Sequence, residues 1–238
     1  MSVVINGVVA GFSALVALGP AAARLTDPVA LSPLTPAAFY RLGTAQVVGA
    51  GVDNWPDASG NVRDLRQTTD TNRPTLNADW SITFDGVDNF LKAAAFTLNQ
   101  PETVYFLGAQ VTWTNNDYVY DGEATNSGLI FQNAVTPVLR CYAGTDVVLA
   151  DSPAVNTDCV LTVVFNGASS RIQRNNGTAS TGDTGAANMG GFTLGARGDG
   201  TGAFSNIRVK EVIIFAAAHD ASVRARVIRY LMTLGGVS

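Results

Sequence analysis

Between Trp55 and Leu91 the chain reads W-P-D-A-S-G-N-V-R-D-L, then R-P-T-L at Arg73–Leu76, then I-T-F-D-G-V-D-N-F-L from Ile82. The first segment contains a tight polar turn, because Asp, Ser, Gly and Asn favour turns. The Arg-Pro step favours an extended backbone at the entry to a strand, and Phe-Asp-Gly is typical of a hairpin corner. Short strands joined by tight turns predict an all-β fold.

The composition of the 238-residue chain supports this class. The 16 Asp residues outnumber the 3 Glu, and there are 24 Gly. Asp favours turns because it bonds to its own backbone, whereas Glu favours helix interiors. The net charge is −4 and the basic residues are spread singly, so the chain has no electrostatic footprint for nucleic acid.

Turn signals divide the chain into short strands. Asn166-Gly167 predicts a two-residue hairpin turn. The segments Thr103–Val111 and Val160–Phe165 are apolar on both alternating sets of residues, so we expect them to be central strands covered on both faces. The expected strands are Phe39–Leu42, Ala45–Val48, Ser81–Phe84, Asn89–Ala94, Glu102–Trp113, Tyr118–Asp121, Leu129–Gln132, Val138–Ala143, Val147–Leu149, Cys159–Asn166, Ser170–Arg174, Gly191–Leu194 and Ala203–Phe215.

A C-terminal helix is expected over residues 220–234. Asp220 is a favourable N-cap, and Gly235 supplies the stop. Apolar residues recur between them at helical spacing, at Val223, Val227, Leu231 and Leu234. This helix should lie against the sandwich.

Residues 1–35 are predicted to form an N-terminal anchoring arm, and residues 36–238 a single domain that includes the helix. The first 23 residues carry no charge, and Arg24 is the first charged side chain. Val3–Ala23 lacks the basic start of a signal peptide, and Gly and Pro residues interrupt it as a membrane-spanning helix. We therefore expect no membrane insertion, but an arm that buries itself in a partner protein and an oligomeric assembly.

Several motifs occur in an order that resembles the laminin-G-like, concanavalin-A-like jelly-roll family: W-P-D-A-S-G-N, R-P-T-L, F-D-G-V-D-N-F-L, L-T-V-V-F-N-G, G-G-F-T-L-G-A-R and I-R-V-K-E-V-I-I-F with the terminal helix. The resemblance covers about residues 36–235 and leaves the arm outside. It implies two antiparallel sheets of about six or seven strands each, packed face to face. Members include glycan-binding and adhesion modules, bacteriophage virion and tail components, and some glycosidases.

A carbohydrate site is one functional hypothesis. Sugars bind to exposed aromatic faces flanked by planar polar side chains, although aromatic residues on strands more often pack in the core. The candidate residues are Trp113, Asn115, Tyr118, Tyr120, Asp121, Arg140 and Tyr142. Arg197-Gly198-Asp199 is interpreted as a glycine-rich turn.

A calcium site is a weaker alternative, because calcium requires about six or more oxygen ligands. Asp53, Asp57, Asp85 and Asp88 could supply some of them, but no loop has the spacing of a dedicated calcium motif. Closing turns is the simpler role for these carboxylates. No other cofactor is expected. Cys141 and Cys159 could form a cross-strand disulfide or remain as two core thiols.

No catalytic residues are predicted. Glycosidases of this fold resemble one another in a strand that carries Glu-x-Asp-x-x-Glu, and Glu102, Glu123 and Glu211 are isolated from one another in the sequence. Period two places Glu211 on the same side as Ile207, Val209, Ile213 and Phe215. We therefore expect an Arg partner, a nest of backbone amides, or a bulge that turns Glu211 outward.

Two functions remain. The first is a non-enzymatic structural or adhesion protein on the surface of a phage-like virion, anchored to other virion proteins through residues 1–35 and able to recognise host polysaccharide. The second is a secreted or bacterial-surface carbohydrate-binding module.

Overall fold

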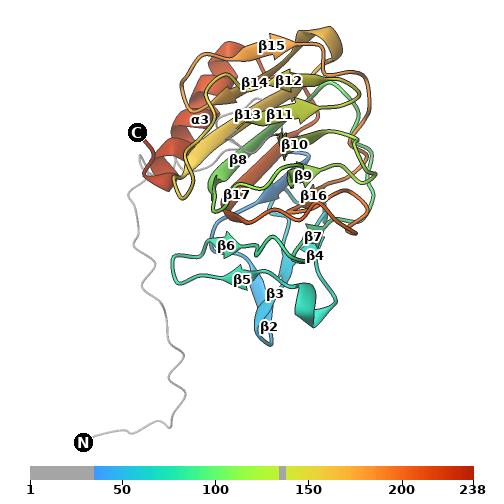
Figure 1. Cartoon of the computed structure of the whole chain (residues 1–238), viewed down its shortest axis with the longest axis vertical. Coiled ribbons are helices and arrows are strands. Elements are labelled where there is room, and N and C mark those ends of the chain that lie inside the picture. Colours follow the sequence, from blue (N-terminus) through green and yellow to red (C-terminus); the bar gives the residue numbers. More distant parts are fainter. Residues whose placement is uncertain (1–34, 134–137) are drawn as a thin grey trace, which may run out of the picture.

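The structure is a computed structural model that describes residues 35–133 and 138–238. Apart from Thr35, the predicted arm lies outside the described residues. The described residues form two antiparallel sheets packed face to face, with α3 (Ala221–Gly235) against one of them (Figure 1). Within this part of the chain, no helix is long and apolar enough to cross a membrane.

Sheet A has eight strands in the described residues, ordered β15-β14-β13-β8-β17-β6-β5 with β1 also paired to β17. Their bounds are β1 Ala38–Tyr40, β5 Thr75–Leu76, β6 Ile82–Thr83, β8 Glu102–Gln110, β13 Cys159–Phe165, β14 Ser170–Arg174, β15 Ser180–Gly182 and β17 Ile207–Phe215.

Sheet B has nine described strands, ordered β12-β11-β10-β9-β16-β7-β4-β3-β2. The resemblance implied about six or seven strands in each sheet. The observed numbers are larger because several of the described strands are only two residues long. The bounds are β2 Gln46–Val48, β3 Gly51–Trp55, β4 Leu65–Arg66, β7 Leu91–Lys92, β9 Tyr118–Asp121, β10 Leu129–Gln132, β11 Leu139–Tyr142, β12 Asp146–Val148 and β16 Thr193–Leu194.

The central strands of sheet A are buried on both faces, as predicted. Every residue of β8 and of β13 is buried. One face of β8, carrying Val104 and Phe106, enters the core between the sheets, and the other, carrying Tyr105 and Leu107, packs under α3. The helix therefore covers the outer face of sheet A.

The caps of α3 are set by Asp220 and a glycine. The Asp220 carboxylate accepts hydrogen bonds from the amides of Ser222 and Val223, as the sequence predicted. The helix ends one residue later than expected, because Gly236, with φ +64°, takes the left-handed conformation of the C-cap. Leu234 is exposed, so the buried stripe ends before it.

Glu211 lies at a bulge in β17, one of the three arrangements expected from the sequence, and therefore does not share a side with Ile207 and Val209. The register of β17 against β8 shifts between Val209 and Glu211, so that Val209 faces the core between the sheets while Glu211 and Ile213 face α3. The Glu211 carboxylate accepts hydrogen bonds from the Tyr230 hydroxyl (2.7 Å) and the Leu42 amide (3.2 Å). Burial raises the pKa of Glu211 to about 7.

Two further sequence expectations are settled. The connection between β13 and β14 is a 3-10 turn, Gly167–Ser169, and not a two-residue turn, because the Ser170 hydroxyl bonds across it to the Asn166 amide and the Gly167 carbonyl. Cys141 and Cys159 are free buried thiols, and burial raises the pKa of each to about 12.

Candidate functional site

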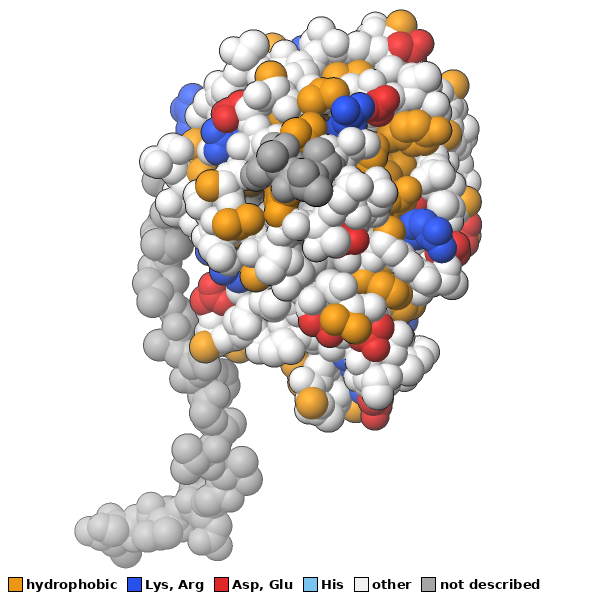
Figure 2. Space-filling view, in the orientation of Figure 1, with side chains coloured by type: hydrophobic (Ala, Val, Ile, Leu, Met, Phe, Trp, Pro, Cys, Tyr) orange, Lys and Arg blue, Asp and Glu red, His pale blue; other side chains and the backbone are white. Residues whose placement is uncertain are grey.

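The outer face of sheet B carries a group of half-buried aromatic side chains on adjacent strands. Phe131 of β10 lies directly opposite Tyr118 of β9 and Arg140 of β11, and Tyr142 of β11 lies opposite Asp146 of β12. The Tyr118 and Phe131 ring centroids are 5.9 Å apart. We call these five residues the outer patch. Figure 2 shows hydrophobic side chains, with basic and acidic ones beside them, over β9 to β12.

A β-bulge decides which tyrosines of β9 reach this patch. Residues two apart on a regular strand share a face, but the register of β9 against β10 shifts between Ile130 and Phe131. Tyr120 therefore pairs with Ile130 and is fully buried in the core, whereas Tyr118 stays half-exposed on the outside. The prediction that Tyr120 contacts a sugar is wrong for this reason.

The patch continues toward the loops on the far side of β9. Phe204 lies beside Tyr118 through a parallel bridge, and its ring centroid is 6.3 Å from that of Phe90. The Tyr118 hydroxyl donates to the side chain of Asn126 at 2.7 Å. Three aromatic residues of this region were not predicted from the sequence as site residues: Phe90, Phe131 and Phe204. Of these, Phe131 could have been predicted, because it lies on an expected strand and pairs with Arg140 on the next one.

Asp121 has a different role from the one predicted. Its carboxylate is fully buried and accepts four backbone hydrogen bonds of 2.8–3.1 Å, from Gly122, Asn126, Ser127 and Gly198. Burial raises the pKa of Asp121, although these four bonds act to lower it. A carboxylate held in this way is not available to a ligand. It fixes the two loops that border the outer patch.

Replacing Asp121 with Ala is expected to lower the free energy of unfolding by on the order of 3 kcal/mol, because four backbone amides lose their acceptor. Urea unfolding followed by circular dichroism measures this. The matched control is Asp151→Ala, since the Asp151 side chain is exposed and, in the part of the chain that the structure describes, pairs with Arg174. Equal stability of the two variants would contradict the role assigned to Asp121.

The remaining sugar candidates lie at the margin of the patch. Trp113 is half-buried and packs against the core, and its Nε1 atom has no hydrogen-bond partner among the described residues. Asn115 is exposed on a loop whose neighbours, Thr114 and Asn116, bond to Gln132 of β10. Tyr118, Arg140 and Tyr142 are thus the candidates that the fold brings together.

The four acidic residues proposed for calcium are used mainly in turns. Asp57 accepts bonds from the amides of Phe39, Ser59 and Arg63, and Asp85 caps the amide of Val87. Asp88 bonds to Asn89, and Asp53 Oδ1 is buried without a partner in the described residues. Across residues 35–133 and 138–238, no three His, Cys, Asp or Glu side chains are grouped as a metal would require.

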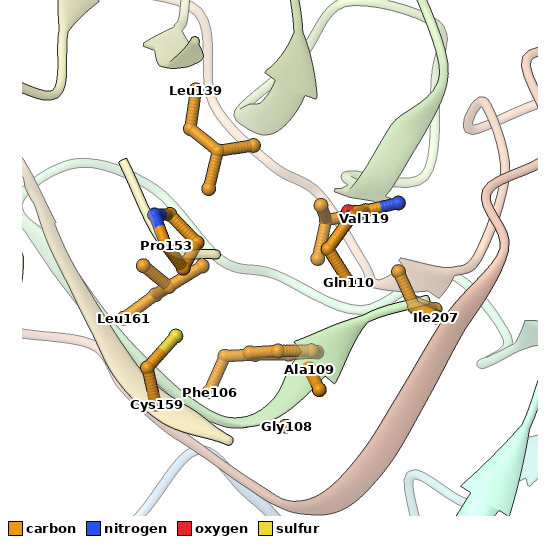
Figure 3. A pocket seen from close by; sticks show the side chains of 10 residues that line it. All are labelled: Phe106, Gly108, Ala109, Gln110, Val119, Leu139, Pro153, Cys159, Leu161 and Ile207. Atoms are coloured by element: carbon orange, nitrogen blue, oxygen red, sulfur yellow. The ribbon is translucent and has the colours of Figure 1, made fainter. Parts of the chain in front are cut away.

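A small cavity lies between the sheets, with a volume of about 10 Å³. Side chains from both sheets converge on it, including Phe106, Val119, Leu139, Cys159 and Ile207 (Figure 3). This volume holds about one water molecule. The cavity is too small for an organic ligand, so we place the candidate site on the outer face of sheet B.

Glu102 is a buried acid, whereas its sequence position indicated only that it is isolated from the other two Glu residues. It is fully buried at the start of β8, and neither carboxyl oxygen has a hydrogen-bond partner among the described residues. The Tyr120 hydroxyl likewise has none there. Burial raises the pKa of Glu102 to about 8, so the group is largely neutral at pH 7.

The other candidate acids and bases occupy separate environments. Glu123 forms an ion pair with Lys92, and Glu211 is buried under α3. His219 is also buried, and its Nδ1 atom lies 2.8 Å from the Tyr105 hydroxyl, with which it shares a hydrogen bond. Burial lowers the pKa of His219 to about 4. These contacts tie α3 and the strands together.

No protein-family model matches the chain, and no curated protein matches it in sequence. Solved structures match it in fold. A Trypanosoma rangeli sialidase in complex with 2,3-difluorosialic acid has a TM-score of 0.58 at 12% identity, over 87% of this chain and 34% of that chain.

The binding domain of botulinum neurotoxin DC in complex with SialylT also has a TM-score of 0.58 at 12% identity, over 83% of this chain and 51% of that chain. The same domain in complex with rat synaptotagmin II has a TM-score of 0.59 at 13% identity, over 83% of this chain and 52% of that chain. The chain thus spans about a third of the sialidase chain and about half of the toxin chains. At these identities the similarity shows the fold alone, and it confirms the two-sheet antiparallel sandwich of the jelly-roll type.

Proposed function

We propose that this chain is a non-enzymatic carbohydrate-binding module, and that the outer patch on sheet B is its binding surface. The observation that carries the proposal is that three half-exposed rings, Tyr118, Phe131 and Tyr142, lie on the same outer face of sheet B, beside the ion pair of Arg140 and Asp146. Aromatic faces bind the apolar faces of sugars, and flanking polar groups bind the hydroxyls.

The burial pattern supports this choice of surface. One outer face of the sandwich is covered by α3, and the cavity between the sheets is too small for a sugar. Proteins of similar fold supply a second kind of support, since they include a botulinum neurotoxin structure described by its interaction with two ganglioside molecules and a binding domain in complex with SialylT.

A glycan array probed with the full chain tests this function. We expect binding to a subset of glycans, and roughly tenfold weaker binding to them when Tyr142 is replaced with Ala. An array on which the full chain binds no glycan would contradict the proposal.

The setting that we favour is the surface of a phage-like virion, with residues 1–35 attached to other virion proteins and the module turned toward host polysaccharide. The uncharged first 23 residues support an attached segment, because an apolar segment is costly to leave in water. The alternative is a secreted or bacterial-surface module.

Deleting residues 1–30 is expected to leave a folded domain that no longer incorporates into particles. Circular dichroism verifies the fold, and co-sedimentation with particles measures incorporation. Normal incorporation of the deletion variant would contradict anchoring by the arm.

A further inference from the structure

Three basic side chains around the outer patch are each paired with a carboxylate. Arg140 and Asp146 form an ion pair within the patch. Arg197 Nη2 lies 3.3 Å from Asp199 Oδ2, on a loop close enough to Tyr118 for both groups to affect its pKa. Lys92 Nζ lies 3.2 Å from Glu123 Oε1 and also donates to two backbone carbonyls. Three cations at this surface are thus each balanced by a carboxylate.

Asp199 is held in its charged form. Its slight burial acts to raise its pKa, but hydrogen bonds from Thr201 and Thr125 and the charge of Arg197 outweigh that effect and lower the pKa. The Asp121 carboxylate lies close by and acts to raise the pKa of Tyr118, so it adds no positive potential. The patch therefore has no excess positive charge.

This balance distinguishes between two classes of sugar. A carboxylate, phosphate or sulfate on a sugar binds best to a cation that lacks a partner, and here it would have to compete with Asp146 or Asp199. A sugar hydroxyl both donates and accepts, so it can bond to an Arg and an Asp that lie side by side. The paired side chains beside the rings therefore suit hydroxyl groups.

We propose that the outer patch selects neutral glycans over glycans that carry an acidic group. The inference rests on the proposed carbohydrate-binding function and names its ligand class. It also predicts which residues exclude acidic sugars. These are Asp146 and Asp199, because the carboxylate of each already pairs with the neighbouring arginine.

The test compares matched oligosaccharides with and without a terminal sialic acid, titrated into the full chain at low and high salt. We expect the neutral member to bind roughly tenfold more tightly, with little dependence on salt. Asp146→Asn and Asp199→Asn leave Arg140 and Arg197 without their charged partner, so both variants should bind the sialylated member several-fold more tightly than the unmodified chain does. Asp151→Asn is the matched control, because it breaks the ion pair with Arg174, which does not border the patch.

The outcomes separate the two claims. Tighter binding of the sialylated member by the unmodified chain, or Asn variants with unchanged preference, would overturn the selection of neutral glycans and leave carbohydrate binding in place. Absence of binding to either member and to every glycan on the array would overturn the proposed function, and this inference with it.

Discussion

Replacing Glu102 with Gln is expected to stabilise the protein increasingly as the pH rises above about 4.5, by on the order of 4 kcal/mol near pH 9. The cause is the buried carboxyl group, whose oxygens have no partner among the described residues and whose pKa burial raises to about 8. Ionising this group inside the sandwich is costly, since no cation or amide among the described residues stabilises the charge. Gln has nearly the same shape and cannot ionise.

The pH window follows from the two pKa values. The unfolded chain releases the Glu102 proton near pH 4.5, whereas the folded chain keeps it until about pH 8. The stability linked to this proton is complete below the first value, declines as the pH rises, and is lost above the second. The Gln variant should lack this decline.

Urea unfolding of both proteins at several pH values between 5 and 9 measures the difference. Glu123→Gln serves as the control, because Glu123 is partly exposed and forms its ion pair with Lys92 outside the core. Parallel curves for the unmodified chain and the Glu102→Gln variant would show that this carboxyl group has the same pKa in the folded and the unfolded chain, and would contradict the raised value.

Replacing both Tyr118 and Tyr142 with Ala is expected to weaken glycan binding about 100-fold, and each single change roughly tenfold. Each ring offers a half-exposed apolar face on the same side of sheet B, so removing one removes contact area with the sugar and leaves the strand in place. Titration calorimetry with a glycan selected on the array gives the dissociation constants.

Trp80→Ala is the matched control for these variants. Trp80 is 56% exposed and lies in the turn between β5 and β6 of sheet A, not on the outer face of sheet B. Thermal unfolding verifies that each variant is folded. Equal affinity of the double variant and the unmodified chain would remove the outer patch as the binding surface, and loss of affinity in Trp80→Ala would move it to that turn.

Much of the fold could be predicted because its signals are local. Asp57 and Asp85 close the turns in which their sequence motifs placed them, and Asp220 caps α3. The two strands that are apolar on both alternating sets became β8 and β13, covered by sheet B on one side and by α3 on the other. These patterns depend on a few neighbouring residues.

The candidate site was predicted only in part, because its geometry depends on register. A single bulge in β9 buries Tyr120 and leaves Tyr118 outside, and a second bulge turns Glu211 toward α3. Neither bulged segment, Tyr118–Tyr120 nor Val209–Glu211, contains a glycine or proline of its own, although Gly108 of β8 lies opposite Val209. The burial of Glu102 was also not predicted, because the residues that surround its carboxyl group come from segments distant in the sequence.

The most direct test of the central claim is an NMR chemical-shift map of the full chain with a glycan selected on the array. If the outer patch binds carbohydrate, the largest shifts will fall on β9, β10 and β11, at Tyr118, Phe131 and Tyr142, with none on α3. Shifts centred on another surface, with the amides of these three residues unchanged, would contradict the claim.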